Sequence, residues 1–195
     1  MQYLFLACLG YLLGSIPFGY IAGKMHNIDL RKVGSGSTGG TNVYRALGIR
    51  WAAAAGLLDV AKGLVFLFLV STFTNVSVDA LYYLSVAPIV GHIFPIWLNF
   101  KGGKGVSVSF GGLIYLLGAP FALVVTVVWL VALKLVKIMS LVNLVLFLLL
   151  PVYVYMTTQS IHPTLASVLI MLLVWWAHRE NIVRLLTHSE KKLNV

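Results

Sequence analysis

The chain has 195 residues, of which 60% are hydrophobic and only 10% are charged. Soluble domains carry about a quarter charged residues, so this composition excludes an ordinary soluble protein and indicates an integral membrane protein. Fourteen Lys and Arg residues against five acidic residues give a net charge of +9. Because the cations lie in short segments between apolar runs, we expect them to reflect membrane topology and not nucleic-acid binding.

Apolar runs of about 20 residues are typical of transmembrane helices. We expect such helices at residues 1–22, 51–71, 80–99, 140–158 and 164–177. The stretch 106–133 is long for one span, and Gly118-Ala119-Pro120 interrupts it. We expect a tight hairpin there, between a short helix and a full one. The sequence thus predicts an all-α membrane protein of about seven transmembrane helices, folded as one domain over residues 1–195.

The positions of Lys and Arg favour seven spans over six. With seven spans, every Lys and Arg outside the helices lies on one side, and the opposite loops at 72–79, 118–120 and 159–163 contain none. An unbroken helix through 106–133 would put Lys134 and Lys137 on the wrong side. The positive-inside rule therefore predicts an outside N-terminus, a cytoplasmic C-terminus and Gly-rich loops on the cytoplasmic side.

The first polar segment on that side contains only small residues and is followed by Arg45. Its members are Gly34, Ser35, Gly36, Ser37, Thr38, Gly39, Gly40, Thr41 and Asn42. Glycine lets backbone N–H groups turn towards one centre, and hydroxyl groups add donors. We expect a phosphate site in which Arg45 makes a forked contact; a flexible polar connector is the alternative. Ser35 lacks the G-x-S-x-G elbow of a nucleophile, so we expect it to act by hydrogen bonding.

The second segment begins at His92 and ends in Lys101-Gly102-Gly103-Lys104-Gly105. Anchoring at the membrane interface would explain the lysines but not the glycines. We therefore expect Lys104, and after it Lys101, to bind phosphate.

The third segment carries His178, Asn181 and Arg184 at helical spacing, on one edge. A lone histidine at a helix end is more often a cap than a catalyst, but three polar groups on one edge favour a site. Ser140 and Asn143 are weaker candidates on the same side. Asp59 and Lys62 lie within a predicted span, where an unpaired charge costs about 2.5–3.5 kcal/mol, so we expect them to form a structural pair.

These motifs, in this order, resemble the PlsY family of bacterial acyl-phosphate:glycerol-3-phosphate acyltransferases. The resemblance covers nearly the whole chain. It departs from the family pattern at Ser37, Gly40 and His188, where Asn, Ala or Thr, and Gly are usual. It rests on residues 14–20, 29–31, 34–45, 91–95, 100–106 and 178–185, together with Asp59, Lys62 and Glu190.

The resemblance implies acyl transfer from acyl phosphate to the 1-hydroxyl of sn-glycerol 3-phosphate. The products are 1-acylglycerol 3-phosphate (lysophosphatidic acid) and phosphate, in the first step of phospholipid synthesis. It also implies a multi-pass protein of the bacterial inner membrane, with its active site on the cytoplasmic side and no cofactor or metal. Membrane lipids and the enzyme that produces acyl phosphate are the expected partners.

We assign the segment from Gly34 to Asn42, with Arg45, to the acyl phosphate. The expected ligands of glycerol 3-phosphate are His92, Lys101, Gly102, Gly103, Lys104, Ser140, Asn143, His178, Asn181 and Arg184. The expected catalytic residues are Ser35, Arg45, Lys104, His178 and Asn181, whereas Glu190 is expected to be structural, like Asp59 and Lys62.

Acyl phosphate is a mixed anhydride with a good leaving group, so positioning and electrostatic stabilisation suffice without a covalent intermediate. The general base is His92, His178 or the phosphate of the donor itself. We favour the donor phosphate, because neither histidine has an obvious carboxylate orienting it. The main alternative function is a transporter of a phosphorylated metabolite, and a lipid-binding scaffold is a third. One-sided cations and the absence of a repeated half argue against a transporter.

Overall fold

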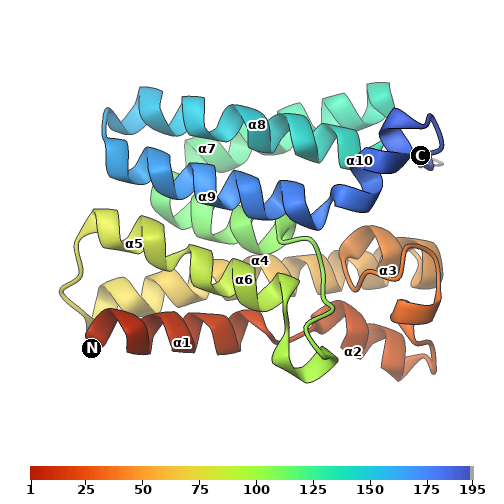
Figure 1. The fold of residues 1–195 in the computed structure, drawn as a ribbon, viewed down its shortest axis with the longest axis horizontal. Helices are drawn as coiled ribbons and strands as arrows, with labels where there is room; N and C mark the ends of the chain where they lie inside the picture. The colour runs from red at the N-terminus through yellow and green to blue at the C-terminus, as the bar shows by residue number, and fades with distance from the viewer. Residues whose placement is uncertain (194–195) are drawn as a thin grey trace.

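The computed structural model describes residues 1–193, in which ten α-helices and two short 3₁₀ turns are joined without any strand. Most of the helices run along a common direction and form a bundle, with the N-terminus at one end and the C-terminus at the other (Figure 1). The helices are α1 (Gln2–Gly14), α2 (Phe18–Met25), α3 (Gly40–Leu47), α4 (Ile49–Phe73), α5 (Val78–Leu84), α6 (Val86–Ile93), α7 (Val106–Val136), α8 (Met139–Thr158), α9 (Ile161–Ala177) and α10 (Arg179–Leu186), and the 3₁₀ turns are η1 (Leu30–Lys32) and η2 (Ile96–Leu98). The all-helical fold predicted from the sequence is confirmed.

The segment α7 is two antiparallel arms, although it forms one continuous helical stretch by its hydrogen bonds. Gly118 has φ 81° and ψ −179°, which no helix accommodates. Val106 and Trp129 line the same cavity, whereas 23 residues of straight helix would separate them by about 34 Å. The rings of Phe110 and Phe121 have centroids 6.3 Å apart, against about 16 Å for eleven residues of straight helix. The hairpin expected at residues 118–120 is therefore present.

Five stretches are long and apolar enough to cross a membrane within residues 1–193, and α9 with α10 makes a sixth if this pair, bent by 64°, is one span. The five are Gln2–Met25, Ile49–Phe73, Val78–Leu98, Val106–Val136 and Met139–Thr158. If the two arms of α7 are counted separately, the number of candidate spans rises from six to seven, the number expected from the sequence. The number of spans and the orientation in the membrane stay predictions.

Two of the expected spans are broken in ways that the sequence analysis did not predict. Residues 1–22 were expected as one helix, but α1 ends at Gly14 and α2 begins at Phe18, after Pro17. Proline has no backbone N–H and restricts the residue before it, which accounts for the interruption. In the third span, Ser85 separates α5 from α6.

Glycines let the central helices approach to backbone contact. A Cβ on Gly111 of α7 would lie 1.9 Å from the carbonyl oxygen of Val60 in α4, and one on Gly63 would lie 2.2 Å from that of Val108. Without a hydrophobic driving force between helices in lipid, such close van der Waals packing is a main source of association. It fixes α4 against the first arm of α7 and so sets the wall behind the site.

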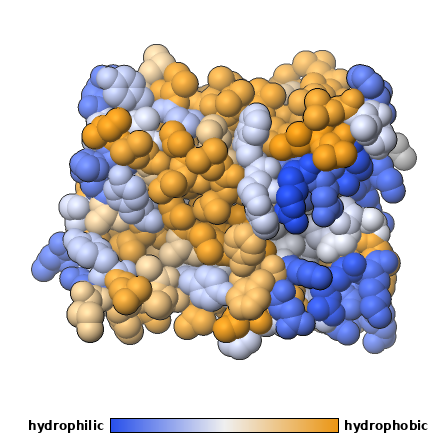
Figure 2. Space-filling view, in the orientation of Figure 1, coloured by the Kyte–Doolittle hydropathy of each residue, from blue (hydrophilic) through white to orange (hydrophobic). Residues whose placement is uncertain are grey.

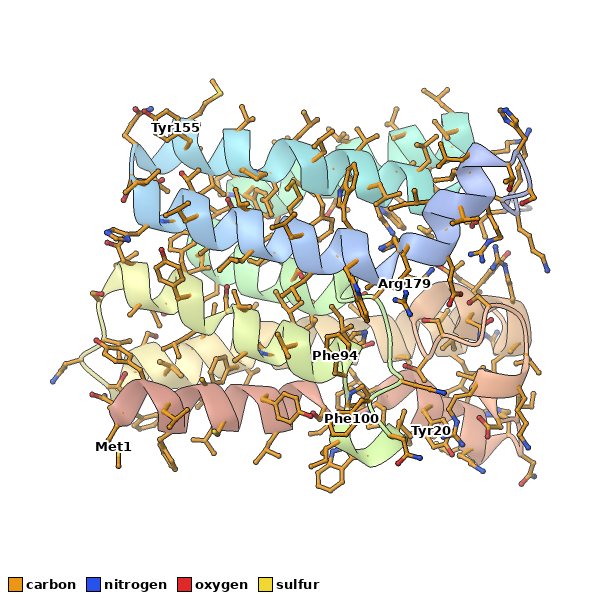
Figure 3. The ribbon with its side chains drawn as sticks, in the orientation of Figure 1. Met1, Tyr20, Phe94, Phe100, Tyr155 and Arg179 are labelled. Atoms are coloured by element: carbon orange, nitrogen blue, oxygen red, sulfur yellow. The ribbon has the colours of Figure 1, made fainter. Side chains whose placement is uncertain are left out.

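The two ends of the bundle differ in polarity. Figure 2 shows hydrophobic residues across the middle of the visible face and hydrophilic residues at both ends, with the larger hydrophilic patch at the end where α2, α3 and α10 lie. In Figure 3, Met1 and Tyr155 lie at the opposite end from Tyr20. The three predicted cationic segments thus meet at one end of the molecule.

Candidate active site

A cavity of about 460 Å³ lies at the polar end, and all three cationic segments contribute to its lining. Lys104 comes from the second segment and His178 and Asn181 from the third, while Asp59 and His92 line the cavity from the helices α4 and α6. Ser140 and Asn143 at the start of α8 also face it. The first segment supplies Ser35, Ser37, Gly39, Gly40, Thr41, Asn42 and Arg45. The structure therefore brings together most of the residues predicted for the site.

Asn42 organises the first loop from within. Its amide nitrogen donates to the carbonyl oxygens of Leu30 (3.0 Å), Val33 (3.1 Å) and Ser37 (2.8 Å), and its amide oxygen accepts from Ser35 N at 3.1 Å. With its side chain only 2% exposed, Asn42 is fully occupied by the loop. Its observed contacts are those of a residue that shapes the first loop.

Backbone conformation explains the glycines that precede Asn42. Gly34 has φ +61° and Gly36 has φ +69°, in the left-handed region that side chains rarely occupy. A Cβ on Gly34 would also lie 2.1 Å from Asn42 Oδ1. These two glycines form the turn and do not line the cavity.

The second loop places Lys104 beside the third segment. Gly102 N donates to Ile93 O at 3.1 Å and Gly103 N to His92 O at 3.0 Å, so the loop folds back onto the end of α6. Lys104 Nζ then reaches across and donates to Asn181 Oδ1. Burial lowers the pKa of Lys104 to about 8, because desolvation penalises the charged ammonium.

The third segment continues this chain of contacts. Asn181 Nδ2 donates to Glu190 Oε1 at 2.8 Å, and Arg184 Nε donates to Glu190 Oε2 at 2.7 Å. Burial opposes ionisation of Glu190. The hydrogen bonds from Arg184 and Asn181, together with the charge of Arg184, outweigh this effect and lower the pKa of Glu190. Glu190 thereby fixes Asn181 under Lys104, which agrees with the structural role expected for it.

The spacing of His178 and Asn181 predicted one continuous helix, and this prediction is wrong. His178 occupies the break between α9 and α10, whose axes differ by 64°. Its Nδ1 lies 2.8 Å from Val174 O, and because a carbonyl oxygen can only accept, Nδ1 carries the proton. In the neutral ring, Nε2 is then the acceptor.

Asp59, Lys62 and His92 form a buried cluster behind the cavity. Lys62 Nζ lies 2.9 Å from Asp59 Oδ1, as expected for a pair, and 2.9 Å from His92 Nδ1. Asp59 Oδ1 also lies 3.4 Å from His92 Nδ1. The expectation that neither histidine has a nearby carboxylate is therefore wrong for His92, because α4 and α6, 30 residues apart in the chain, pack together here.

Several predicted site residues lie outside the cavity lining. Lys101 is exposed, and Arg184 is engaged with Glu190. Thr38 is buried and its N–H reaches Gly102 O at 3.5 Å, which joins the first loop to the second. Gly34, Gly36, Gly102 and Gly103 also do not line the cavity. Binding roles for these residues stay predictions.

Four lining residues with polar side-chain groups were missed: Tyr44, Ser107, Trp129 and Lys191. Trp129 Nε1 donates to Asn143 Oδ1 at 2.9 Å, which leaves the amide N–H groups of Asn143 for the cavity. No sequence signal marks Trp129, since it stands in a long apolar run. Lys191 belongs to the basic C-terminal stretch and could have been found by its charge.

A second, apolar cavity of about 390 Å³ adjoins the first. The two share Val106, Ser107, Trp129 and Asn143. The second lies between both arms of α7 and α8, and runs from Asn143 towards Tyr153. A polar cavity rich in cations and amide groups thus opens into an apolar one of a size suited to an alkyl chain.

Comparison with known proteins gives one consistent result. The family model for glycerol-3-phosphate acyltransferase matches residues 4–188. The glycerol-3-phosphate acyltransferase of Gloeobacter violaceus is 43% identical over 190 residues, which cover 94% of this chain and 91% of that protein. That of Rhodopseudomonas palustris is 42% identical over 188 residues, covering 95% and 92%.

Two solved structures have the same fold. Both are of PlsY, an integral membrane glycerol 3-phosphate acyltransferase, and cover 100% of this chain and 96% of the matched chain. Its glycerol 3-phosphate form gives a TM-score of 0.90 at 35% identity. Its lysophosphatidic acid form gives 0.88 at 33%.

Proposed function

The chain belongs to the glycerol-3-phosphate acyltransferase family of multi-pass membrane enzymes, and we propose that its acyl donor is an acyl phosphate. The acceptor is the 1-hydroxyl of sn-glycerol 3-phosphate, and the products are lysophosphatidic acid and inorganic phosphate. The observation that carries this proposal is the junction of a cationic cavity with an apolar one. Two phosphate groups and one alkyl chain fit these two environments.

The first loop and Arg45 form the proposed site of the donor phosphate. Gly39 and Gly40 stand at the N-terminus of α3, where unpaired backbone N–H groups and the helix dipole favour an anion. Asn42 holds this loop in shape, and the Arg45 guanidinium provides a forked contact. The acyl chain then extends into the apolar cavity between the arms of α7 and α8.

Lys104, His178 and Asn181 form the proposed site of glycerol 3-phosphate. Lys104 comes from the second loop, His178 from the break between α9 and α10, and Asn181 from α10. All three line the same cavity as the first loop, so the acceptor hydroxyl can lie next to the acyl carbon. Neutralising two phosphates in one cavity removes their mutual repulsion, and aligned reactants can gain effective molarities of about 10⁵–10⁸ M. The relatives named for their glycerol 3-phosphate and lysophosphatidic acid forms support these assignments.

The reaction forms one carbon–oxygen bond and breaks another. The acceptor oxygen attacks the carbonyl carbon, and the cations and N–H groups of the cavity stabilise the oxyanion. The bond between the acyl carbon and the phosphate oxygen then breaks. The departing phosphate takes the hydroxyl proton, so no protein nucleophile or base is needed.

The identity of the base can be tested at the two histidines. His92 Nδ1 accepts from Lys62 and is not free to take a proton, whereas His178 Nε2 is available. If the donor phosphate is the base, His178→Ala keeps turnover within about tenfold at saturating substrates. A loss of several orders of magnitude at unchanged KM would assign the proton to His178.

The remaining parts of the proposal concern location. The bundle spans the inner membrane of a bacterial cell. Its polar end faces the cytoplasm, because the loops with Lys and Arg are at that end. There it meets soluble glycerol 3-phosphate, membrane lipids and the enzyme that produces the acyl phosphate.

One assay tests the proposed function. Purified protein is incubated with palmitoyl phosphate and glycerol 3-phosphate, and lysophosphatidic acid and phosphate are measured. We expect equal amounts of both products. Arg45→Ala should lower the activity about 30-fold, which corresponds to loss of a charged hydrogen bond of about 2 kcal/mol. Arg50 lies outside the cavity, so Arg50→Ala should not change the activity. Activity with acyl-CoA or acyl carrier protein, but not with acyl phosphate, would refute the donor assignment.

A further inference from the structure

A buried charged cluster connects the first helix of the protein to the loop that carries Lys104. Lys62 Nζ lies 2.8 Å from Gly14 O and 3.0 Å from Ile16 O, at the break between α1 and α2. The same nitrogen lies 2.9 Å from Asp59 Oδ1 and 2.9 Å from His92 Nδ1. Three helical segments, α1, α4 and α6, are thus joined at one ammonium group.

The break between α1 and α2 explains why an ammonium is held there. Helix α1 ends at Gly14 and α2 begins only at Phe18, so the carbonyl oxygens of Gly14 and Ile16 lack their usual helical partners, the N–H groups four residues later. In a membrane, an unpaired carbonyl costs several kcal/mol, and the C-terminal end of a helix dipole favours a cation. Lys62 is 3% exposed, and the four contacts of its ammonium group fix its position.

The hydrogen bond from Lys62 fixes the tautomer of His92. An ammonium group can only donate, so Nδ1 accepts and Nε2 carries the proton. Nε2 lies against the second loop, because a Cβ on Gly103 would be 2.0 Å from it. The backbone of His92 also accepts from Gly103 N at 3.0 Å. His92 therefore contacts the residue next to Lys104 with both its ring and its carbonyl.

We propose that Lys62 and His92 are positioning residues that hold the second loop where Lys104 can bind glycerol 3-phosphate. The inference rests on the proposed function and goes further, since it gives Lys62 a role in acceptor binding and makes His92 act through the second loop as well as from the cavity lining. His92 orients the loop, Lys62 orients His92, and Asp59 balances the charge of Lys62. The donor site is formed by the first loop, which Asn42 holds in shape. It meets the second loop through the long contact from Thr38 N to Gly102 O (3.5 Å), so we expect the link to affect the donor less than the acceptor.

Two substitutions of His92 separate the two ends of the link. In His92→Asn, Oδ1 takes the place of Nδ1 and keeps the acceptor for Lys62. In His92→Gln, the amide reaches the place of Nε2, and the acceptor beside Lys62 is lost. Because both ends belong to the link, we expect His92→Asn, which loses the ring contact with Gly103, to raise the KM for glycerol 3-phosphate about 30-fold.

For His92→Gln we expect the KM for glycerol 3-phosphate to rise about 30-fold, while kcat and the KM for acyl phosphate stay within about threefold. This is the order of loss that a displacement of under 1 Å causes, since 1 Å can cost about 100-fold. His162→Gln, at the opposite end of the bundle, is the matched control and leaves all three parameters unchanged.

A second variant tests the link if His92→Gln does not fold. Asp59→Asn combined with Lys62→Met removes the charges together, which buried pairs tolerate better than loss of one partner. The same selective rise in the glycerol 3-phosphate KM is expected. An unchanged glycerol 3-phosphate KM in either folded His92 variant, or a rise in the acyl phosphate KM instead, would overturn the inference. If the wild-type protein does not transfer an acyl group to glycerol 3-phosphate, the proposed function itself is refuted.

Discussion

We predict that the charge of Lys104 makes acceptor binding depend on pH in the alkaline range. Burial lowers the pKa of Lys104 to about 8, well below the value of about 10.4 for an exposed lysine. The ammonium is present below this pH and is lost as the pH rises through it. At pH 7 about 90% of the free enzyme carries the charge, and at pH 9 about 10% does.

The expected result is a fall in kcat/KM for glycerol 3-phosphate above about pH 8, by up to tenfold per unit. The fall ends at a floor, because an uncharged amine still donates a hydrogen bond. Loss of a charged hydrogen bond is worth about 1.5–3 kcal/mol, so the floor lies about 10- to 150-fold below the plateau. Bound phosphate stabilises the ammonium, so the profile of kcat turns at a higher pH than that of kcat/KM.

The assay is the initial rate of lysophosphatidic acid formation between pH 6.5 and 10, with the remaining acyl phosphate quantified at each pH as a control for its hydrolysis. In Lys104→Arg the side chain stays charged throughout, so the alkaline fall disappears even if the overall rate is lower. A wild-type profile that is flat to pH 10, or a Lys104→Arg profile with the same fall, would refute the reasoning.

Three further predictions concern the scaffold of the site. Asn42→Ala leaves buried carbonyl groups of the first loop without donors, and we expect a loss of about 2–4 kcal/mol with a raised KM for acyl phosphate; an unchanged thermal midpoint in detergent would contradict this. Gly111→Ala forces a methyl group into the backbone of α4 and should lower the thermal midpoint by at least 5 °C, whereas Gly56→Ala, with open space around it, should not lower it. Glu190→Gln removes a carboxylate whose pKa is lowered, so we expect a destabilisation of about 1 kcal/mol above about pH 4.3 that shrinks at lower pH. A difference that grows on acidification would contradict it.

The sequence predicted the features that depend on local composition. Apolar runs of membrane-crossing length gave the all-helical fold, and Gly118 with Pro120 marked the hairpin in α7. The Asp59–Lys62 pair follows from helical spacing within one segment. The broken first span was missed, although Pro17 is visible, because a single proline kinks some helices and interrupts others, and the surrounding contacts decide between them.

Only the tertiary structure decided which polar groups are free to face the cavity and which form hydrogen bonds within the protein. Asn42 reads as a ligand in the sequence, yet its amide is occupied by the first loop. Trp129 stands in a long apolar run without any sequence signal, yet it lines both cavities. His92 meets Lys62 only because α4 and α6 pack together. A hydrogen bond needs two partners at a set distance, and residues far apart in the chain gain that distance only through folding.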